Sequence, residues 1–527
     1  MKKVKLLFVL IALFANLFIL AQDKPAQAEQ AGEVPGQKEI TLKEAIFIAL
    51  KNNLDLQISM IAAENSRNSV RISNADFIPQ LSIDLTTQES EYPSTGVLAG
   101  ADIVNNKYLA MDLSISQKLA IGGDLIITLQ NQRSESNVTW NTVNPSLSSR
   151  LQIILNQPLL KGFGTLAAKK NIYVAFTDQK KSEFQLKRQI LDLVYTLENA
   201  YWNLVFAFQN LDTMKMSLKR SQDLLKQNRI KVKVGAAAPI DIFDAEANVA
   251  ADESNLLQAE QAIQNAEEEL KKLLNMSSLE QAIIPTDRPE VKKIDVDFNA
   301  FLLEALEKRP DVQQAKLDLK RYKIEVKYAR NQMMPDLQLS AQYWTTGQGG
   351  DQLITEGNIF LGNYRVIGVI KKDIWETMKD TFSNLYKNYS LMLSLKIPIS
   401  NSRERALLSM AKLQLESSFL TLKNTENTVY SEVKQAIRSL ESNLKLVDAQ
   451  KIRLELEDKK LKAEEKKLAV GLVSNYDVIL KQREYVAAQT NHLNALKNFN
   501  MSIADINRKL CRTFDAYDIK FTDFLKK

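Results

Sequence analysis

The chain has 527 residues, 45% of them hydrophobic and 25% charged, and its 69 basic and 63 acidic residues give a net charge of +6. This composition excludes a disordered chain and a membrane protein built only of helices. Basic and acidic residues are interleaved, which is typical of a solvated surface, so we expect no nucleic-acid partner. One histidine and one cysteine give no His/Cys metal cluster and no catalytic pair. We therefore expect no catalytic residue, no metal and no cofactor.

The first residues have the pattern of a secretory signal. Lys2, Lys3 and Lys5 precede an uncharged run that ends at Ala21. We predict a signal peptide here, with a retained membrane anchor as the alternative. After Ala21 no uncharged run reaches the ~18 residues that a transmembrane helix needs. Any further crossing of a membrane is therefore expected to use strands.

The first predicted helix starts at Thr41, which stands three residues before Glu44 in the spacing of a capping box, and it ends before Pro79. Four segments follow in which apolar and polar residues alternate, which is typical of strands with two different faces. One face carries Leu, Ile and Met, and the other carries Asp, Ser, Thr and Gln. A barrel wall between lipid and water needs this pattern, and an ordinary sheet over a core is the alternative.

A very long helix is predicted over about 165–232, because apolar residues repeat there in alternating steps of four and three. This seam consists of Ile190, Val194, Leu197, Tyr201, Leu204, Phe208 and Leu211. Gly235 is expected to break the helix. Pro239 then fits the first turn of a shorter helix that runs to about Asn275.

The second half of the chain repeats this plan. Residues 45–81 align with 301–337 at an offset of 256, and Val234-Gly235-(x)5-Asp241 corresponds to Val470-Gly471-(x)5-Asp477. A fixed internal period predicts two structural repeats. Between its two alternating segments, the second half is expected to hold a long glycine-containing loop over about 346–388.

These patterns define the predicted organisation. It consists of a signal peptide (1–21), a flexible leader (22–39), a first repeat (40–275, strands within 81–158), a connection (276–297), a second repeat (298–512, strands within 336–399) and a C-terminal tail (513–527). The fold class is mixed and mainly α.

One chain has too few strands to close a barrel, and lipid does not tolerate an exposed sheet edge. The barrel is therefore expected to be shared between chains. The first half offers four alternating segments and the second only two. The additional pair, at about 108–133, either widens the barrel or forms a hairpin outside it, so the number of strands per chain is four or six.

The sequence resembles the TolC-like family of outer-membrane channel-tunnel proteins. The resemblance is carried by Ile40-Thr41-Leu42-Lys43-Glu44-Ala45, Ala49-Leu50-Lys51-Asn52-Asn53, Pro79 and Pro335 at strand entries, the run from Asn156 to Gly164, Ala200-Tyr201-Trp202, and both Val-Gly-(x)5-Asp turns. It implies a homotrimer whose shared β-barrel lies in the outer membrane and whose helical coiled-coil tunnel crosses the periplasm.

The resemblance also implies a passive exit duct, not an enzyme. Such ducts serve tripartite efflux or type I secretion systems and dock a periplasmic adaptor and an inner-membrane pump. The cargo is left open. The alternatives are a secreted coiled-coil scaffold with a small β domain and a periplasmic adaptor.

Two groups of residues are candidates for function. Asp241, Asp244 and Asp477 are candidates for pore or gate carboxylates; acids in a first helical turn also offset the helix dipole. The family's gate-linking positions hold Val473 and Leu468, so those contacts are not expected. Exposed residues at the predicted helix tips are candidates for docking an adaptor: Lys231, Val234, Gly235, Lys467, Val470 and Gly471.

Overall fold

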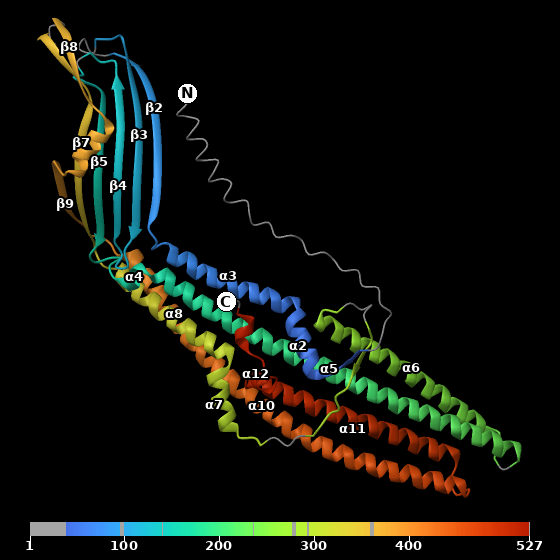
Figure 1. Ribbon diagram of the computed structural model, residues 1–527. Helices are drawn as coiled ribbons and strands as arrows, with labels where there is room; N and C mark the ends of the chain where they lie inside the picture. The colour runs from blue at the N-terminus through green and yellow to red at the C-terminus, as the bar shows by residue number, and fades with distance from the viewer. Residues whose placement is uncertain are drawn as a thin grey trace.

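The computed structural model describes residues 38–94, 100–139, 141–235, 237–276, 281–291, 295–358 and 363–525. The predicted signal peptide lies outside the described residues, as does the predicted leader up to residue 37. The chain forms a sheet of long strands at one end and a long bundle of helices that continues from it (Figure 1).

The elements of the first half follow one another as a short strand, two helices, four strands, a helix of one turn and two long helices. They are β1 (Lys38–Ile40), α2 (Leu42–Asn52), α3 (Leu54–Ala75), β2 (Gln80–Pro93), β3 (Ile103–Lys118), β4 (Asp124–Ser136), β5 (Val143–Pro158), α4 (Thr165–Ala168), α5 (Lys170–Lys233) and α6 (Ile240–Leu274).

The second half has the same order, with a hairpin and a short helix added between its strands. Its elements are β6 (Ile283–Pro285), α7 (Phe298–Lys308), α8 (Pro310–Gln332), β7 (Asp336–Asn358), β8 (Asn363–Lys372), α9 (Ile374–Phe382), β9 (Tyr386–Lys396), α10 (Ser402–Ala469), α11 (Asn475–Lys509), α12 (Thr513–Ala516) and a 3₁₀ turn (Phe521–Phe524).

The large sheet is antiparallel, in the order β2-β3-β4-β5-β7-β9. Apolar residues lie opposite one another across it: Leu113 pairs with Leu129, and Leu129 pairs with Leu151. The predicted alternation therefore produces one continuous apolar face. The additional strand pair, β3 and β4, lies within the sheet between β2 and β5, so it widens the sheet and is not a separate hairpin.

The predicted loop over 346–388 is wrong. β7 extends to Asn358, its far part pairs with β8, and α9 follows before the chain returns in β9. The glycines that suggested a loop have a packing role. A Cβ atom at Gly347 would collide with the carbonyl oxygen of Thr377, and one at Gly349 with the Thr377 hydroxyl. They are needed because α9 lies directly on the strand.

Each half places two shorter helices end to end beside one long helix. α3 and α6 both pack on α5, and α8 and α11 both pack on α10. The 64 residues of α5 span roughly 95 Å at about 1.5 Å per residue. α5 also contacts α8 and α11, which joins the two halves into one bundle. None of the described helices combines the length and apolar character needed to cross a membrane.

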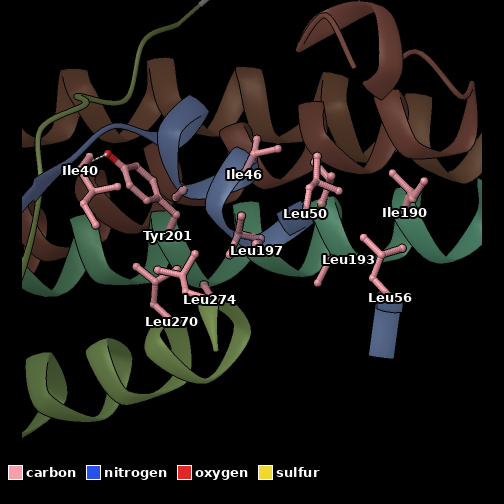
Figure 2. Packing of buried hydrophobic residues seen from close by; sticks show 14 of the residues in the cluster. Ile40, Ile46, Leu50, Leu56, Ile190, Leu193, Leu197, Tyr201, Leu270 and Leu274 are labelled. Carbon is pink, nitrogen blue, oxygen red and sulfur yellow. Dashed lines mark hydrogen bonds between the residues drawn. The ribbon is translucent and has the colours of Figure 1, made fainter. Parts of the chain in front are cut away.

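The largest buried cluster lies where α2, α5 and α6 meet the short strands β1 and β6. Figure 2 shows Leu197 and Tyr201 of α5 in this cluster, with Ile40 and Ile46 on one side and Leu270 on the other. The predicted seam is confirmed: Ile190, Val194, Leu197, Tyr201, Leu204 and Leu211 are all buried, and Phe208 is partly buried.

β1 and β6 form a parallel pair that was not predicted from the sequence. Lys38 and Glu39, placed in the leader, pair with Ile283 and Ile284, placed in the connection between repeats. A strand of three residues is too short to show a period of two. The pair ties the start of the first repeat to the segment that follows it.

The Tyr201 hydroxyl stabilises this junction, since it lies 2.7 Å from Asp287 Oδ2 and 3.0 Å from the Ile40 carbonyl oxygen. Replacing Tyr201 by Phe removes these contacts and leaves the Asp287 N–H, which lies 3.3 Å from the hydroxyl, without that acceptor. We expect a loss of about 1–3 kcal/mol in the free energy of unfolding. Denaturant titration of the detergent-solubilised protein measures this, with Tyr173→Phe at an exposed site of the same helix as the control. Equal unfolding midpoints for the two variants would contradict the assignment.

Candidate functional site at the helix tips

Two glycine turns reverse the chain at the end of the bundle farthest from the sheet (Figure 1). Gly235 follows α5 with φ of 74°, and Gly471 follows α10 with φ of 76°. This left-handed conformation favours glycine. At the second turn the Leu472 N–H donates to the Lys467 carbonyl oxygen at 3.0 Å, which completes a Schellman motif. Apart from the chain neighbours, no atom of the described residues lies within 4 Å of a Cβ built on either glycine, so backbone conformation selects them.

Both tips expose apolar side chains. These are Val234, Ile240 and Phe243 at the first tip, and Val470, Leu472 and Tyr476 at the second. Each is at least 59% exposed. Exposed apolar side chains gathered at the end of a helix pair make each tip a candidate interaction surface.

The two predicted docking lysines differ. Lys467 is exposed, and its Nζ lies 3.0 Å from Glu464 Oε2 on the preceding turn of α10. Lys231 is partly buried at the end of α5. The apolar residues therefore contribute more of the free surface at the tips than the lysines do.

The three candidate carboxylates lie at the starts of α6 and α11. Asp477 Oδ2 accepts hydrogen bonds from the Ser474 hydroxyl at 2.6 Å and the Ser474 N–H at 3.0 Å, which lowers the pKa of Asp477. Asp241 Oδ2 accepts from the Ala238 N–H at 3.2 Å. Asp244, one turn later, is exposed. Asp241 and Asp477 thus form hydrogen bonds that stabilise the N-termini of α6 and α11. A role of these carboxylates in a pore stays a prediction.

Above the tips, α5, α6 and α11 meet through a cluster that we call the polar layer. It consists of Ser217 and Ser221 of α5, Asn248 and Asp252 of α6, and Gln482 and Arg483 of α11. All except Arg483 are at most 9% exposed. Buried polar groups are stable only when they are hydrogen-bonded, so their contacts fix how these helices meet.

Within the first helix pair, the Ser217 and Ser221 hydroxyls donate to Asp252 Oδ2, and Asn248 Nδ2 donates to Ser221 Oγ at 2.8 Å. Gln482 Nε2, from the other pair, lies 3.1 Å from both the Ser217 carbonyl oxygen and Ser221 Oγ.

Arg483 adds a second link between the pairs, because its Nη2 donates to Asn248 Oδ1 at 3.1 Å. The α10–α11 pair is therefore fastened to the α5–α6 pair by polar contacts. A cavity of about 570 Å³ lies beside them, between α5, α6 and α11.

Sequence reasoning missed the polar layer, although a signal was present. In α6 the buried positions Ala245, Asn248, Asp252 and Ala259 follow heptad spacing, with polar residues at two of them. A polar residue on a coiled-coil seam fixes register and partner at a cost in stability. Only the apolar seam positions entered the prediction. Among the described residues, no group of three His, Cys, Asp or Glu side chains is placed to hold a metal ion.

Comparison with known proteins gives the family. A family model described as "Outer membrane efflux protein" matches residues 125–276 and 302–507, which are more than half of the chain. The chain belongs to the outer membrane efflux protein family. The two matched segments fall in the two halves that the internal repeat predicts, and the predicted resemblance is confirmed.

Two curated relatives of this efflux protein come from Pseudomonas. Outer membrane protein OprJ of Pseudomonas aeruginosa is 23% identical over 464 residues, 86% of this chain and 77% of OprJ. The probable efflux pump outer membrane protein TtgC of Pseudomonas putida is 20% identical over 454 residues, 85% of this chain and 78% of TtgC.

A solved structure shows the same fold. The Campylobacter jejuni CmeC outer membrane channel superposes with a TM-score of 0.61 at 17% identity, over 89% of this chain and 85% of that one. The predicted fold class, mixed and mainly α with a sheet continued by long helices, is thereby confirmed. The family match confirms the predicted outer-membrane location. The sheet of one chain is open.

Replacing Gln482 by Ala should loosen the fastening between the two helix pairs. Losing two hydrogen bonds of about 1 kcal/mol each shifts a two-state equilibrium by roughly 30-fold. We expect a higher open probability for Gln482→Ala in planar lipid bilayers. Gln222→Ala, at an exposed glutamine of α5 next to Ser221, is the matched control and should behave as wild type. Identical single-channel traces for both variants would show that the polar layer does not restrain the tip.

Proposed function

We propose that this efflux protein is a homotrimeric exit duct that passively conducts substrates outward from a periplasmic adaptor and an inner-membrane pump. The observation that carries the proposal is the open sheet. β2 pairs only with β3, and β9 only with β7, among the described strands. Both outer strands are almost entirely exposed in the single chain.

The two open edges are complementary in direction. β2 runs away from the helices and β9 runs back toward them. β9 of one copy can therefore pair with β2 of the next in the antiparallel sense of the rest of the sheet. The sheet has seven described strands, of which β8 pairs only with the far part of β7. Three copies of the other six would form a barrel of eighteen strands, which leaves no open edge in lipid.

The helices attached to these edges are also incomplete in the single chain. α3 leads into β2, and α10 follows β9. Both expose large apolar side chains: Ile58, Ile61 and Ile72 on α3, and Met410, Leu413 and Leu420 on α10. The β2 edge and the α3 face thus both lack a neighbour on one side of the chain, and the β9 edge and the α10 face both lack one on the other side. The alternative of a secreted scaffold does not explain why both sheet edges and both helix faces are left exposed.

The work of the duct is geometric. The apolar outer face gives a wall that lipid accepts, the long helices give reach, and the tips give a place for opening. We expect no catalysis and no cofactor, and energy has to come from the pump. The exposed tip residues Val470 and Leu472 are proposed to contact the adaptor, and Asp244 is proposed to face the pore.

Single-particle electron microscopy of the detergent-purified protein tests the assembly. We expect a three-fold particle with eighteen strands inside the detergent belt and a helical rod on the order of 100 Å long. Twelve strands, with one hairpin of each chain outside the barrel, would contradict the strand count. A monomer that needs no detergent would contradict the duct.

The docking surface has a separate test. Leu472→Asp places a charge on the exposed tip without touching the polar layer, so trimers should form normally while efflux in a strain lacking its own duct is lost. The separate variant Leu472→Met keeps an apolar side chain at this position, so it should retain efflux. Full efflux by Leu472→Asp at wild-type protein levels would show that the adaptor binds elsewhere.

A further inference from the structure

We propose that a groove between α9 and the sheet, which we call the α9 groove, binds an anionic lipid of the outer leaflet, one whose phosphate is not neutralised by a cationic headgroup. The inference rests on the membrane placement of the sheet. Four observations carry it: the face on which α9 lies, the apolar lining of the groove, its depth in the wall, and the cations at its rim.

α9 packs over β5 and β7. The Thr381 hydroxyl donates to the Ser149 carbonyl oxygen at 3.2 Å, and the Thr345 hydroxyl donates to the Thr381 carbonyl oxygen at 2.7 Å. Thr345 lies two residues from Tyr343 and opposite Leu151, so it belongs to the apolar face. The helix is therefore on the outer wall and not in the lumen.

The groove beside α9 has a volume of about 680 Å³, within the ~300–1,000 Å³ of sites that hold small molecules. Its lining is mostly apolar and includes Leu109, Met111 and Leu129 of the strands and Ile374, Trp375 and Met378 of α9. Trp375 is 73% exposed and borders the opening. Hydrocarbon chains are the ligands that such a lining accepts.

The groove lies at the upper limit of the apolar band. Lys107 is the next residue of β3 beyond Leu109, in the direction of the loops, whose side chain lies on the apolar face. On β4 the next such residues beyond Leu129 are Asn131 and Arg133. On this face the apolar side chains are therefore followed by charged ones within one or two alternate residues toward the loops. This change marks the depth of lipid headgroups, where an acyl chain and a phosphate lie side by side.

Three cations line the rim: Arg133, Lys371 and Lys372. Arg133 Nη2 lies 2.7 Å from Glu135 Oε2, and Lys372 is paired with Asp380. Lys371 is the most available, since its side chain is 76% exposed and its Nζ lies 3.9 Å from Asp351 Oδ2. The lining carboxylate of Asp373 accepts from the Glu376 N–H at 2.8 Å as the cap of α9. Arg133 and Lys371 are thus placed to contact a phosphate.

A second copy of the chain does not fill this groove in the proposed trimer. Copies meet along β2 and β9, whereas the strand residues of the groove belong mainly to β3, β4 and β5 in the middle of the sheet. The groove therefore faces the membrane in the assembled barrel.

Native mass spectrometry of the detergent-purified protein tests the proposal, with phosphatidylglycerol and phosphatidylcholine of identical acyl chains as probes. We expect saturable binding of one phosphatidylglycerol per chain, about tenfold tighter than phosphatidylcholine. Met111→Trp fills the groove and should abolish this binding. Leu393→Trp, on the apolar face of β9 outside the groove, is the matched control and should leave it unchanged.

A variant that leaves the groove open tests the rim. Arg133→Ala combined with Lys371→Ala should remove the preference for phosphatidylglycerol while weak binding of both lipids persists. Equal binding of the two lipids by wild type, or equal loss in Met111→Trp and Leu393→Trp, would overturn the proposal. The same spectra give the mass of the assembly, so a failure to form trimers is distinguished from a failure to bind lipid.

Discussion

The backbone groups of β2 and β9 that face away from the sheet have no strand partner among the described residues of one chain. In lipid each unsatisfied N–H or C=O group costs several kcal/mol, so a sheet with two open edges is not stable in a membrane by itself. Pairing between copies removes this cost for every edge residue at once. The assembly is therefore a condition of the membrane-embedded fold and not an addition to it.

The internal repeat and the helix lengths follow from the same constraint. A closed barrel of shared strands has to be continued by helices that also close around an axis, and each half supplies one long helix lined by two shorter ones. The short helices meet at the level of the buried cluster around Tyr201, where β1 and β6 fix the junction. Farther down, the polar layer replaces apolar packing between the helix pairs. A hydrogen-bonded network in a buried position specifies one arrangement of the helices, so this level fixes how the two pairs meet.

Much of the fold was predictable from the sequence because its signals are periodic. Alternation in the four segments between 81 and 158 gave β2 to β5, and steps of four and three gave α5 and its buried seam. The two Val-Gly turns gave the tips. The predicted loop over 346–388 failed because Gly347 and Gly349 suggested irregular backbone, whereas they permit α9 to lie on β7. A contact between segments thirty residues apart leaves no period to detect.

The candidate site shows the same division. The positions of Asp241 and Asp477 in the first turns of helices followed from the spacing of Gly, Pro and Asp, and the structure assigns both carboxylates local hydrogen bonds. The polar layer depends on which seam positions of α5, α6 and α11 meet at one level. That alignment is set by tertiary packing, so Ser221 and Gln482 could not be paired from the sequence.

Hydrogen exchange of the assembled particle tests most directly whether the barrel closes between copies. If β9 of one chain pairs with β2 of the next, the amides of both edge strands should exchange as slowly as those of β4, which is paired on both sides within one chain. Fast exchange along β2 and β9, with protected amides in β4, would show that the edges stay unpaired and would contradict the shared barrel.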